Sequence, residues 1–108
     1  MEWLRYVSYF FGGLVLVNAL PHFVSGTLGR PFQSPFAKPS GEGLSSSTVN
    51  TLWGAFNLVL GYLLVYRVGS FDLRLTSHAL SAGLGGLLSA SFAAHHFGRF
   101  NGGNSPAQ

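Results

Sequence analysis

Three long apolar stretches alternate with short polar or turn-rich segments along the chain. They cover roughly residues 3–24, 49–68 and 78–97, and the formal charges lie at or outside their ends. Each stretch has about 20 residues, the length that a helix needs to cross the hydrocarbon core of a bilayer. The pattern therefore predicts an all-α integral membrane protein, with three transmembrane helices in an up-down-up bundle formed by a single membrane domain over residues 1–108.

The first stretch also has features of a cleavable signal peptide. Arg5 lies where a charged leader region would begin, and Val17 and Ala19 are small enough to precede a cleavage site. We expect a true membrane span instead. Pro21 lacks a backbone N–H, so it is expected to kink or end this helix.

The connecting segments differ sharply from the apolar stretches in composition. A loop over 25–47 is rich in Pro, Gly and Ser, a polar hairpin covers 69–75, and a flexible tail covers 101–108. Ser47 or Thr48 is the expected N-cap of the second helix. Phe32 and Phe36 in the loop are expected to pack over the helix ends or to dip into the lipid headgroups.

The amino-acid composition favours a location in lipid and argues against binding to nucleic acid. Only 8% of the residues are Asp, Glu, Lys or Arg, whereas an ordinary soluble domain has about 25%. The net charge is +3, but Lys and Arg do not cluster as a phosphate-binding surface requires. We therefore expect the basic residues to contact anionic lipid headgroups.

Small and polar residues follow one face of the second and third stretches. On the second they recur at helical spacing at Asn50, Gly54, Asn57 and Gly61, and on the third at Ser81, Gly85 and Ser89. A neighbouring stripe on the third contains Ala82, Gly86 and Ala90. Small residues in lipid let two helix backbones approach closely, so these two faces are expected to meet. The alternative is a polar path or a small-molecule site.

Histidines provide the other candidate chemistry. Asn18 and His22 share a face of the first helix, and an up-down-up topology brings them to the same leaflet as His95 and His96, with His78 in the opposite leaflet. Haem or a transition metal held by His22 with His95 or His96 is one reading. We expect no cofactor and no metal, because no Cys or acidic side chain lies close in sequence to complete a ligand set.

The sequence lacks the common enzyme motifs, and two classes of function remain open. The chain contains no phosphate loop, dinucleotide fingerprint or zinc-protease motif, so no catalytic residues are assigned and an enzyme is not expected. We expect an accessory or structural subunit of a larger membrane protein complex, with the lipid bilayer and other membrane subunits as partners. The alternative is a small oligomeric transport or haem- or metal-binding redox module that uses the intramembrane Asn and His residues.

The orientation of a membrane protein is usually predicted from the distribution of Lys and Arg on its two sides. The three spans would put Arg5, Arg67 and Arg74 on one side and Arg30, Lys38 and Arg99 on the other. The positive-inside count is tied, and the N-terminal amine adds a charge that favours a multi-pass protein with its N-terminus inside.

Overall fold

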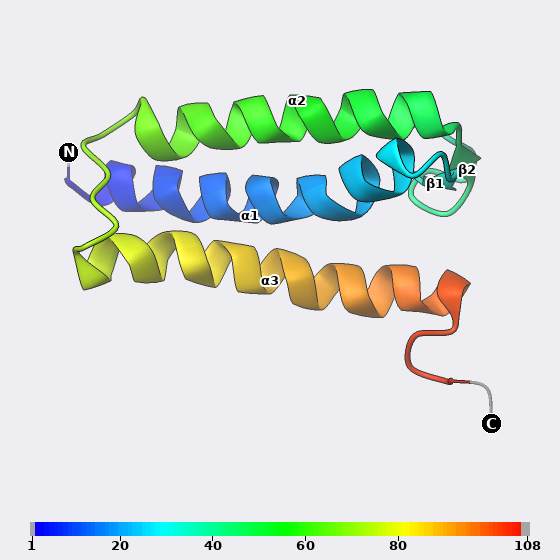
Figure 1. Cartoon of the computed structure of the whole chain (residues 1–108). Helices are drawn as coiled ribbons and strands as arrows, with labels where there is room; N and C mark the ends of the chain where they lie inside the picture. The colour runs from blue at the N-terminus through cyan, green and yellow to red at the C-terminus, as the bar shows by residue number, and fades with distance from the viewer. Residues whose placement is uncertain (1, 107–108) are drawn as a thin grey trace.

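The computed structural model describes residues 2–106, and three helices dominate it (Figure 1). They are α1 (Glu2–Thr27), α2 (Ser47–Tyr66) and α3 (Thr76–Asn101). The loop between α1 and α2 also contains two short strands, β1 (Phe32–Gln33) and β2 (Leu44–Ser45), which pair antiparallel with Phe32 opposite Ser45. The expectation of a mainly helical chain is confirmed, whereas the small sheet was not expected.

The helices lie side by side with α1 in the middle, and Figure 1 shows α2 and α3 on its two sides. The expectation that the small faces of α2 and α3 meet each other is therefore wrong. Each of these faces packs against α1 instead. The reason is that α1 carries small residues of its own, with Gly12 packed against α2 and Gly13 against α3, so that it accepts a close neighbour on both sides.

The helix boundaries differ from the expected ones at several ends. Pro21 does not end α1, which continues to Thr27, so the loop starts later than expected. Ser46, rather than Ser47 or Thr48, is the N-cap of α2, and its hydroxyl accepts from the backbone N–H of Val49. The third helix is longer at both ends than the expected 78–97.

The C-terminus of α3 is closed by glycine. Gly102 has a φ of 74°, a left-handed conformation that glycine adopts without strain, and its N–H bonds to the Gly98 carbonyl. The expected flexible tail thus starts from a capped helix end. Its positions 107 and 108 lie outside the described residues.

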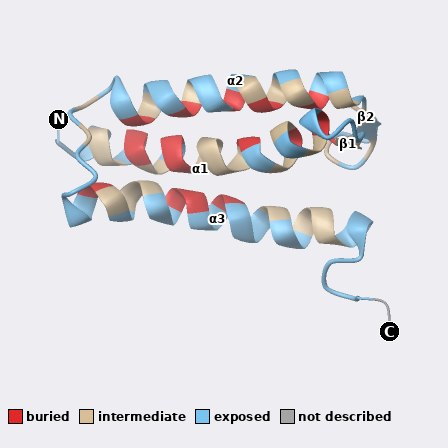
Figure 2. Ribbon diagram, in the orientation of Figure 1, coloured by how far each residue is buried: buried red, intermediate tan, exposed pale blue. Residues whose placement is uncertain are grey.

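Side chains are arranged inside out compared with a water-soluble protein (Figure 2). The buried polar residues of the helices are Ser8, His22, Asn50, Asn57, His78 and Ser89. Large apolar side chains point outward from all three helices, for example Val24 from α1, Leu52 from α2 (65% exposed) and Leu87 from α3 (63% exposed). Such a surface is costly in water, where large exposed apolar patches are rare on monomers.

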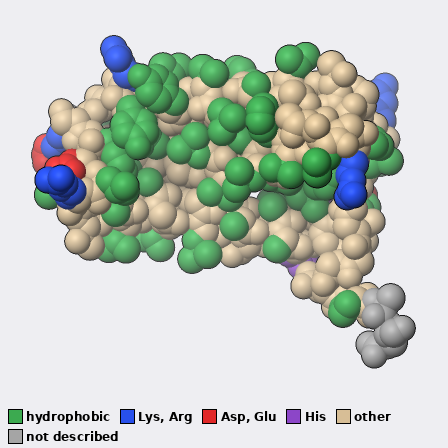
Figure 3. Space-filling model, in the orientation of Figure 1, with side chains coloured by type: hydrophobic (Ala, Val, Ile, Leu, Met, Phe, Trp, Pro, Cys, Tyr) green, Lys and Arg blue, Asp and Glu red, His purple; other side chains and the backbone are tan. Residues whose placement is uncertain are grey.

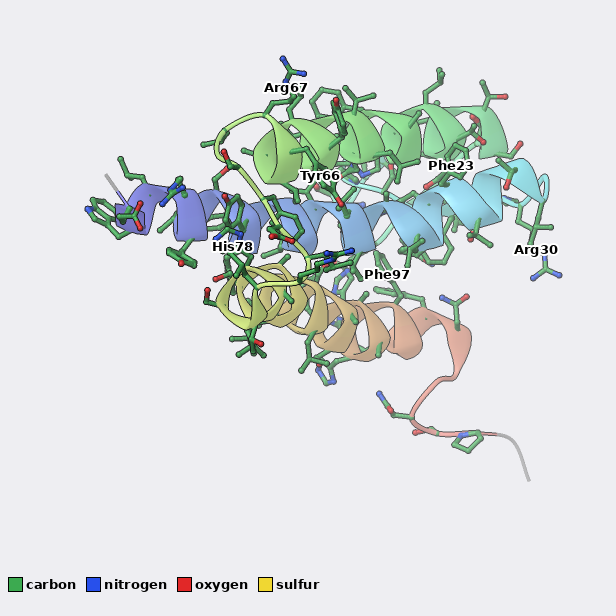
Figure 4. All side chains as sticks on the ribbon, turned by 60° about the vertical axis from the view of Figure 1, so that its left-hand side comes forward. Phe23, Arg30, Tyr66, Arg67, His78 and Phe97 are labelled. Atoms are coloured by element: carbon green, nitrogen blue, oxygen red, sulfur yellow. The ribbon has the colours of Figure 1, made fainter. Side chains whose placement is uncertain are left out.

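The charged residues lie mainly toward the ends of the bundle. Figure 3 shows Lys and Arg toward both ends of the long axis on this face, with hydrophobic side chains spread over the region between them. Arg67 and Arg30 point away from the helices at opposite ends (Figure 4). Among the described residues, α1 and α2 are long and apolar enough to cross a membrane, whereas α3, with many Gly, Ser and Ala residues, does not reach the same hydropathy.

Candidate functional site

A seam of polar side chains joins α1 to α2. Asn18 donates from Nδ2 to Asn57 Oδ1 over 3.1 Å, and one turn further along, His22 Nδ1 lies 2.8 Å from Asn50 Oδ1. At the other end of α1, the Ser8 hydroxyl donates to the Leu64 carbonyl. These three bonds join α1 to α2 at separate points along their length, so they favour one register of the two helices.

Asn50 is the centre of this seam and is fully buried. The two hydrogens of its Nδ2 are shared among three backbone carbonyls, those of Phe32, Ser45 and Ser46. The amide orientation is set by these acceptors, which leaves Oδ1 to face His22. Nδ1 of His22 must therefore carry the hydrogen and donate, and in the neutral ring the lone pair is on Nε2.

Glycines let α2 approach α1 along the same seam. A Cβ on Gly54 would lie 2.6–2.8 Å from the Cβ, N and Cα of Phe23, and one on Gly61 would collide with the Leu16 side chain. The expected packing face of α2, residues Asn50, Gly54, Asn57 and Gly61, is buried as a whole. Its partner is α1 rather than α3.

On the other side of α1, the small residues of α3 make the contact. A Cβ on Gly85 would overlap the Phe10 carbonyl, and Gly13 of α1 packs in the same way against the Ala82 backbone. Ser89 is buried and Ser81 is half-buried. The stripe of Ser81, Gly85 and Ser89 on α3 therefore lies at or near the interface with α1.

A cavity of about 300 Å³ lies where the three helices meet the long loop. Asn18 and His22 of α1, Trp53 of α2, and Phe92, His96 and Phe97 of α3 contribute to its walls. Ser34, Pro35, Ser40 and Gly41 of the loop complete it. His96 holds the loop in place because its Nε2 donates to the Gly41 carbonyl over 2.6 Å.

Aromatic rings surround the buried His22 imidazole, which is only 2% exposed. The ring centroids of Phe32 and Phe97 lie 5.6 and 5.7 Å from that of His22, and the Trp53 ring lies 6.4 Å away. Figure 4 shows Phe97 on the side of α3 that is turned toward α1. Trp53 carries an enclosed Nε1–H that has no hydrogen-bond partner among the described residues.

The structure brings together part of the polar cluster that the sequence indicated. Asn18, His22 and His96 line the same cavity, whereas His95 is exposed and borders a different hollow beside Arg99. Within residues 2–106, no three His, Cys, Asp or Glu side chains converge as a metal site would require. Sequence reasoning missed Trp53, Phe97 and the loop serines, and the spacing of Trp53 four residues before Asn57 was the available signal for one of them.

His78 belongs to the opposite end of the bundle. It lies between the start of α3 and α1 in Figure 4, with ring centroids 5.5 and 5.0 Å from those of Tyr6 and Tyr9. Its Nδ1 accepts a hydrogen bond from the backbone N–H of Asp72 over 3.0 Å. This bond anchors the hairpin between α2 and α3 to the helical core.

Comparisons with known protein families, with curated proteins and with solved structures found no match to this chain.

Proposed function

We propose that this protein is an integral membrane protein whose three helices all cross the bilayer, and that it acts as an accessory or structural subunit of a larger membrane complex rather than as an enzyme. The observation that carries the proposal is the inverted burial, with polar and small residues inside and large apolar side chains outside. Lipid tails solvate that exterior, while the interior bonds satisfy groups that would be costly in hydrocarbon.

The outward apolar side chains of α3 support including it among the spans, although its overall hydropathy is lower than that of α1 and α2. Leu80, Leu84, Leu87 and Leu88 are all more than half exposed. Several of the small or polar residues of α3 are buried inside the bundle instead, namely His78, Gly85, Gly86 and Ser89.

A second surface of α3 supports the role as a subunit. Gly83, Ala90 and Ala94 are exposed on the face turned away from α1, and a Cβ on Gly83 would meet nothing within 4 Å. Small residues in lipid stabilise mainly by close approach to another helix. This face is therefore available for a helix of another membrane protein.

Single-cysteine labelling from the two sides of the membrane tests the topology, because the chain contains no native Cys. Ser70→Cys in the hairpin should be labelled from one side, and Ser40→Cys and Ser105→Cys from the other. Labelling of Ser70→Cys from the cytoplasm would support the proposed N-terminus-inside orientation. Labelling of Ser105→Cys from the same side as Ser70→Cys would show that α3 does not cross, and would contradict the three-span proposal.

Site-specific photocrosslinking in native membranes tests the subunit role. A photoreactive residue at Leu87, beside the outward small face, should give one reproducible adduct with a larger membrane protein, and Gly83→Leu should abolish it. The matched control is Val59, which is 60% exposed on α2 and should label lipid alone. Lipid labelling alone at both positions would contradict the subunit role.

A further inference from the structure

The cavity at the loop end has the size and lining of a small-molecule site. Its volume of about 300 Å³ is at the lower end of the range for ligand pockets, about 300–1,000 Å³. Aromatic rings of Phe92, Phe97 and Trp53 form much of the wall, and a few polar groups converge between them. Apolar walls with a few placed polar atoms are typical of sites that orient one functional group of a ligand.

Three of the lining side chains each keep a hydrogen-bond acceptor that no described residue uses. His22 uses its Nδ1–H on Asn50, and its Nε2 has no hydrogen-bond partner among the described residues. His96 uses its Nε2–H on the Gly41 carbonyl, which leaves the lone pair on Nδ1 in the neutral ring. Asn18 donates from Nδ2 to Asn57, and its Oδ1 likewise has no partner in the described part of the chain. A ligand that pairs with any of these three atoms must donate a hydrogen bond.

An apolar groove of about 560 Å³ adjoins the cavity and is lined by Phe36, Val49, Leu52, Trp53 and Phe56. Trp53 belongs to both the cavity and the groove. The groove lies on the outer face of α2, where Leu52 and Phe56 are more than half exposed. An amphiphile with its polar end in the cavity has a place for its apolar tail in this groove.

We propose that the cavity binds a membrane-soluble phenolic amphiphile, whose hydroxyl donates to His22 Nε2 and whose tail lies in the groove beside Trp53. A phenol ring matches the aromatic walls, and a hydroxyl is both donor and acceptor. Trp53, which also lines the cavity, has an enclosed Nε1–H that lacks an acceptor among the described residues. Quinones, carboxylates and phosphates offer acceptors only and leave His22 Nε2 unpaired. The proposal goes beyond the subunit role but rests on the proposed location in the membrane.

Binding is tested on the full chain in phosphatidylcholine nanodiscs, with protein-free nanodiscs as the blank for partition into lipid. The probes are decylhydroquinone, its dimethyl ether, decylbenzoquinone and dodecanol, and the ligand retained on captured nanodiscs is quantified by chromatography. Decylhydroquinone should be retained near one equivalent per chain. The ether, the quinone and dodecanol should each bind at least about tenfold more weakly than decylhydroquinone. The ether and the quinone lack the hydroxyl donor, and dodecanol lacks the ring.

Variants separate a specific site from general hydrophobic binding. His22→Phe keeps an aromatic ring but removes Nε2, and Ser40→Leu fills the cavity from the exposed loop without altering a helix. Both should lose decylhydroquinone, whereas the matched variant His95→Phe, outside the cavity, should retain it. Because His22→Phe also loses the bond to Asn50, its folding is checked by circular dichroism, and Ser40→Leu tests the site independently of that bond.

Three results would overturn the proposal: retention no greater than in the blank, equal retention of the ether or dodecanol, or unchanged retention in Ser40→Leu. The topology and crosslinking experiments are independent of these measurements. Loss of binding with intact three-span labelling would reject the ligand site alone. Failure of the chain to enter nanodiscs would instead reject the membrane location and, with it, the site.

Discussion

His22 of α1 donates from Nδ1 to Asn50 Oδ1 of α2, a distance of 2.8 Å between two buried side chains that are 28 positions apart in sequence. The same Asn50 side chain holds the loop through the carbonyls of Phe32, Ser45 and Ser46. One amide thus connects two helices and the small sheet. It also leaves Nε2 as the nitrogen that carries the lone pair in the neutral His22 ring.

Replacing this amide should be the most damaging polar substitution in the bundle. Asn50→Ala removes the hydrogen bonds to three carbonyls and leaves His22 Nδ1 without its acceptor, so we expect a loss of about 2–4 kcal/mol in the free energy of unfolding. Chemical unfolding in mixed micelles measures it. The control is Asn101→Ala, which removes an exposed bond to the Phe97 carbonyl and should change stability by about 0.5 kcal/mol or less. Equal effects of the two would contradict the central role of Asn50.

Two glycines of α3 should respond oppositely to the same added methyl group. A Cβ at Gly85 overlaps the Phe10 carbonyl, which is backbone and moves only with the helix, so Gly85→Ala should cost about 2 kcal/mol or more. Gly83 has open space, so Gly83→Ala should be neutral or gain up to about 1 kcal/mol from helix propensity. Thermal unfolding in detergent compares them. A stable Gly85→Ala variant would argue against close packing of α3 on α1.

The bond between Asn18 and Asn57 is expected to be a modest coupling rather than a decisive one. Hydrogen bonds between helices in membranes are worth about 0.6 kcal/mol on average and up to about 1.7 kcal/mol. A double-mutant cycle of Asn18→Ala and Asn57→Ala should give a coupling energy in that range, because the Nδ2 to Oδ1 distance is 3.1 Å. Strict additivity would show that the two amides do not interact.

His78 should control the local stability of the hairpin without being needed for the bundle. His78→Phe keeps a ring against Tyr6 and Tyr9 but removes the Nδ1 acceptor of the Asp72 N–H, so hydrogen exchange of that amide should accelerate. Exchange of amides in the middle of α1 should stay unchanged and serves as the internal control. Unaltered exchange at Asp72 would mean that the imidazole does not anchor the hairpin.

Much of the secondary structure follows from local patterns in the sequence. The apolar stretches and turn-rich gaps predicted three helices with breaks near the observed ones, because hydrophobic length and glycine or proline content act locally. The helix ends were less well predicted. Pro21 stays inside α1, where packing of the following Phe23 and Gly26 against α2 favours continuing the helix.

The sequence by itself determined which residues share a face of a helix. Only the tertiary structure decided which neighbouring helix each face contacts. The spacing of Asn50, Gly54, Asn57 and Gly61 places them together on α2 whatever the partner is. The choice of α1 over α3 depends on small residues on both sides of α1, Gly12 toward α2 and Gly13 toward α3. The cavity depends further on four separate segments meeting at His22, Trp53, His96 and the loop. Helical periodicity is a property of neighbours along the chain, whereas complementarity between surfaces exists only once the helices are packed together.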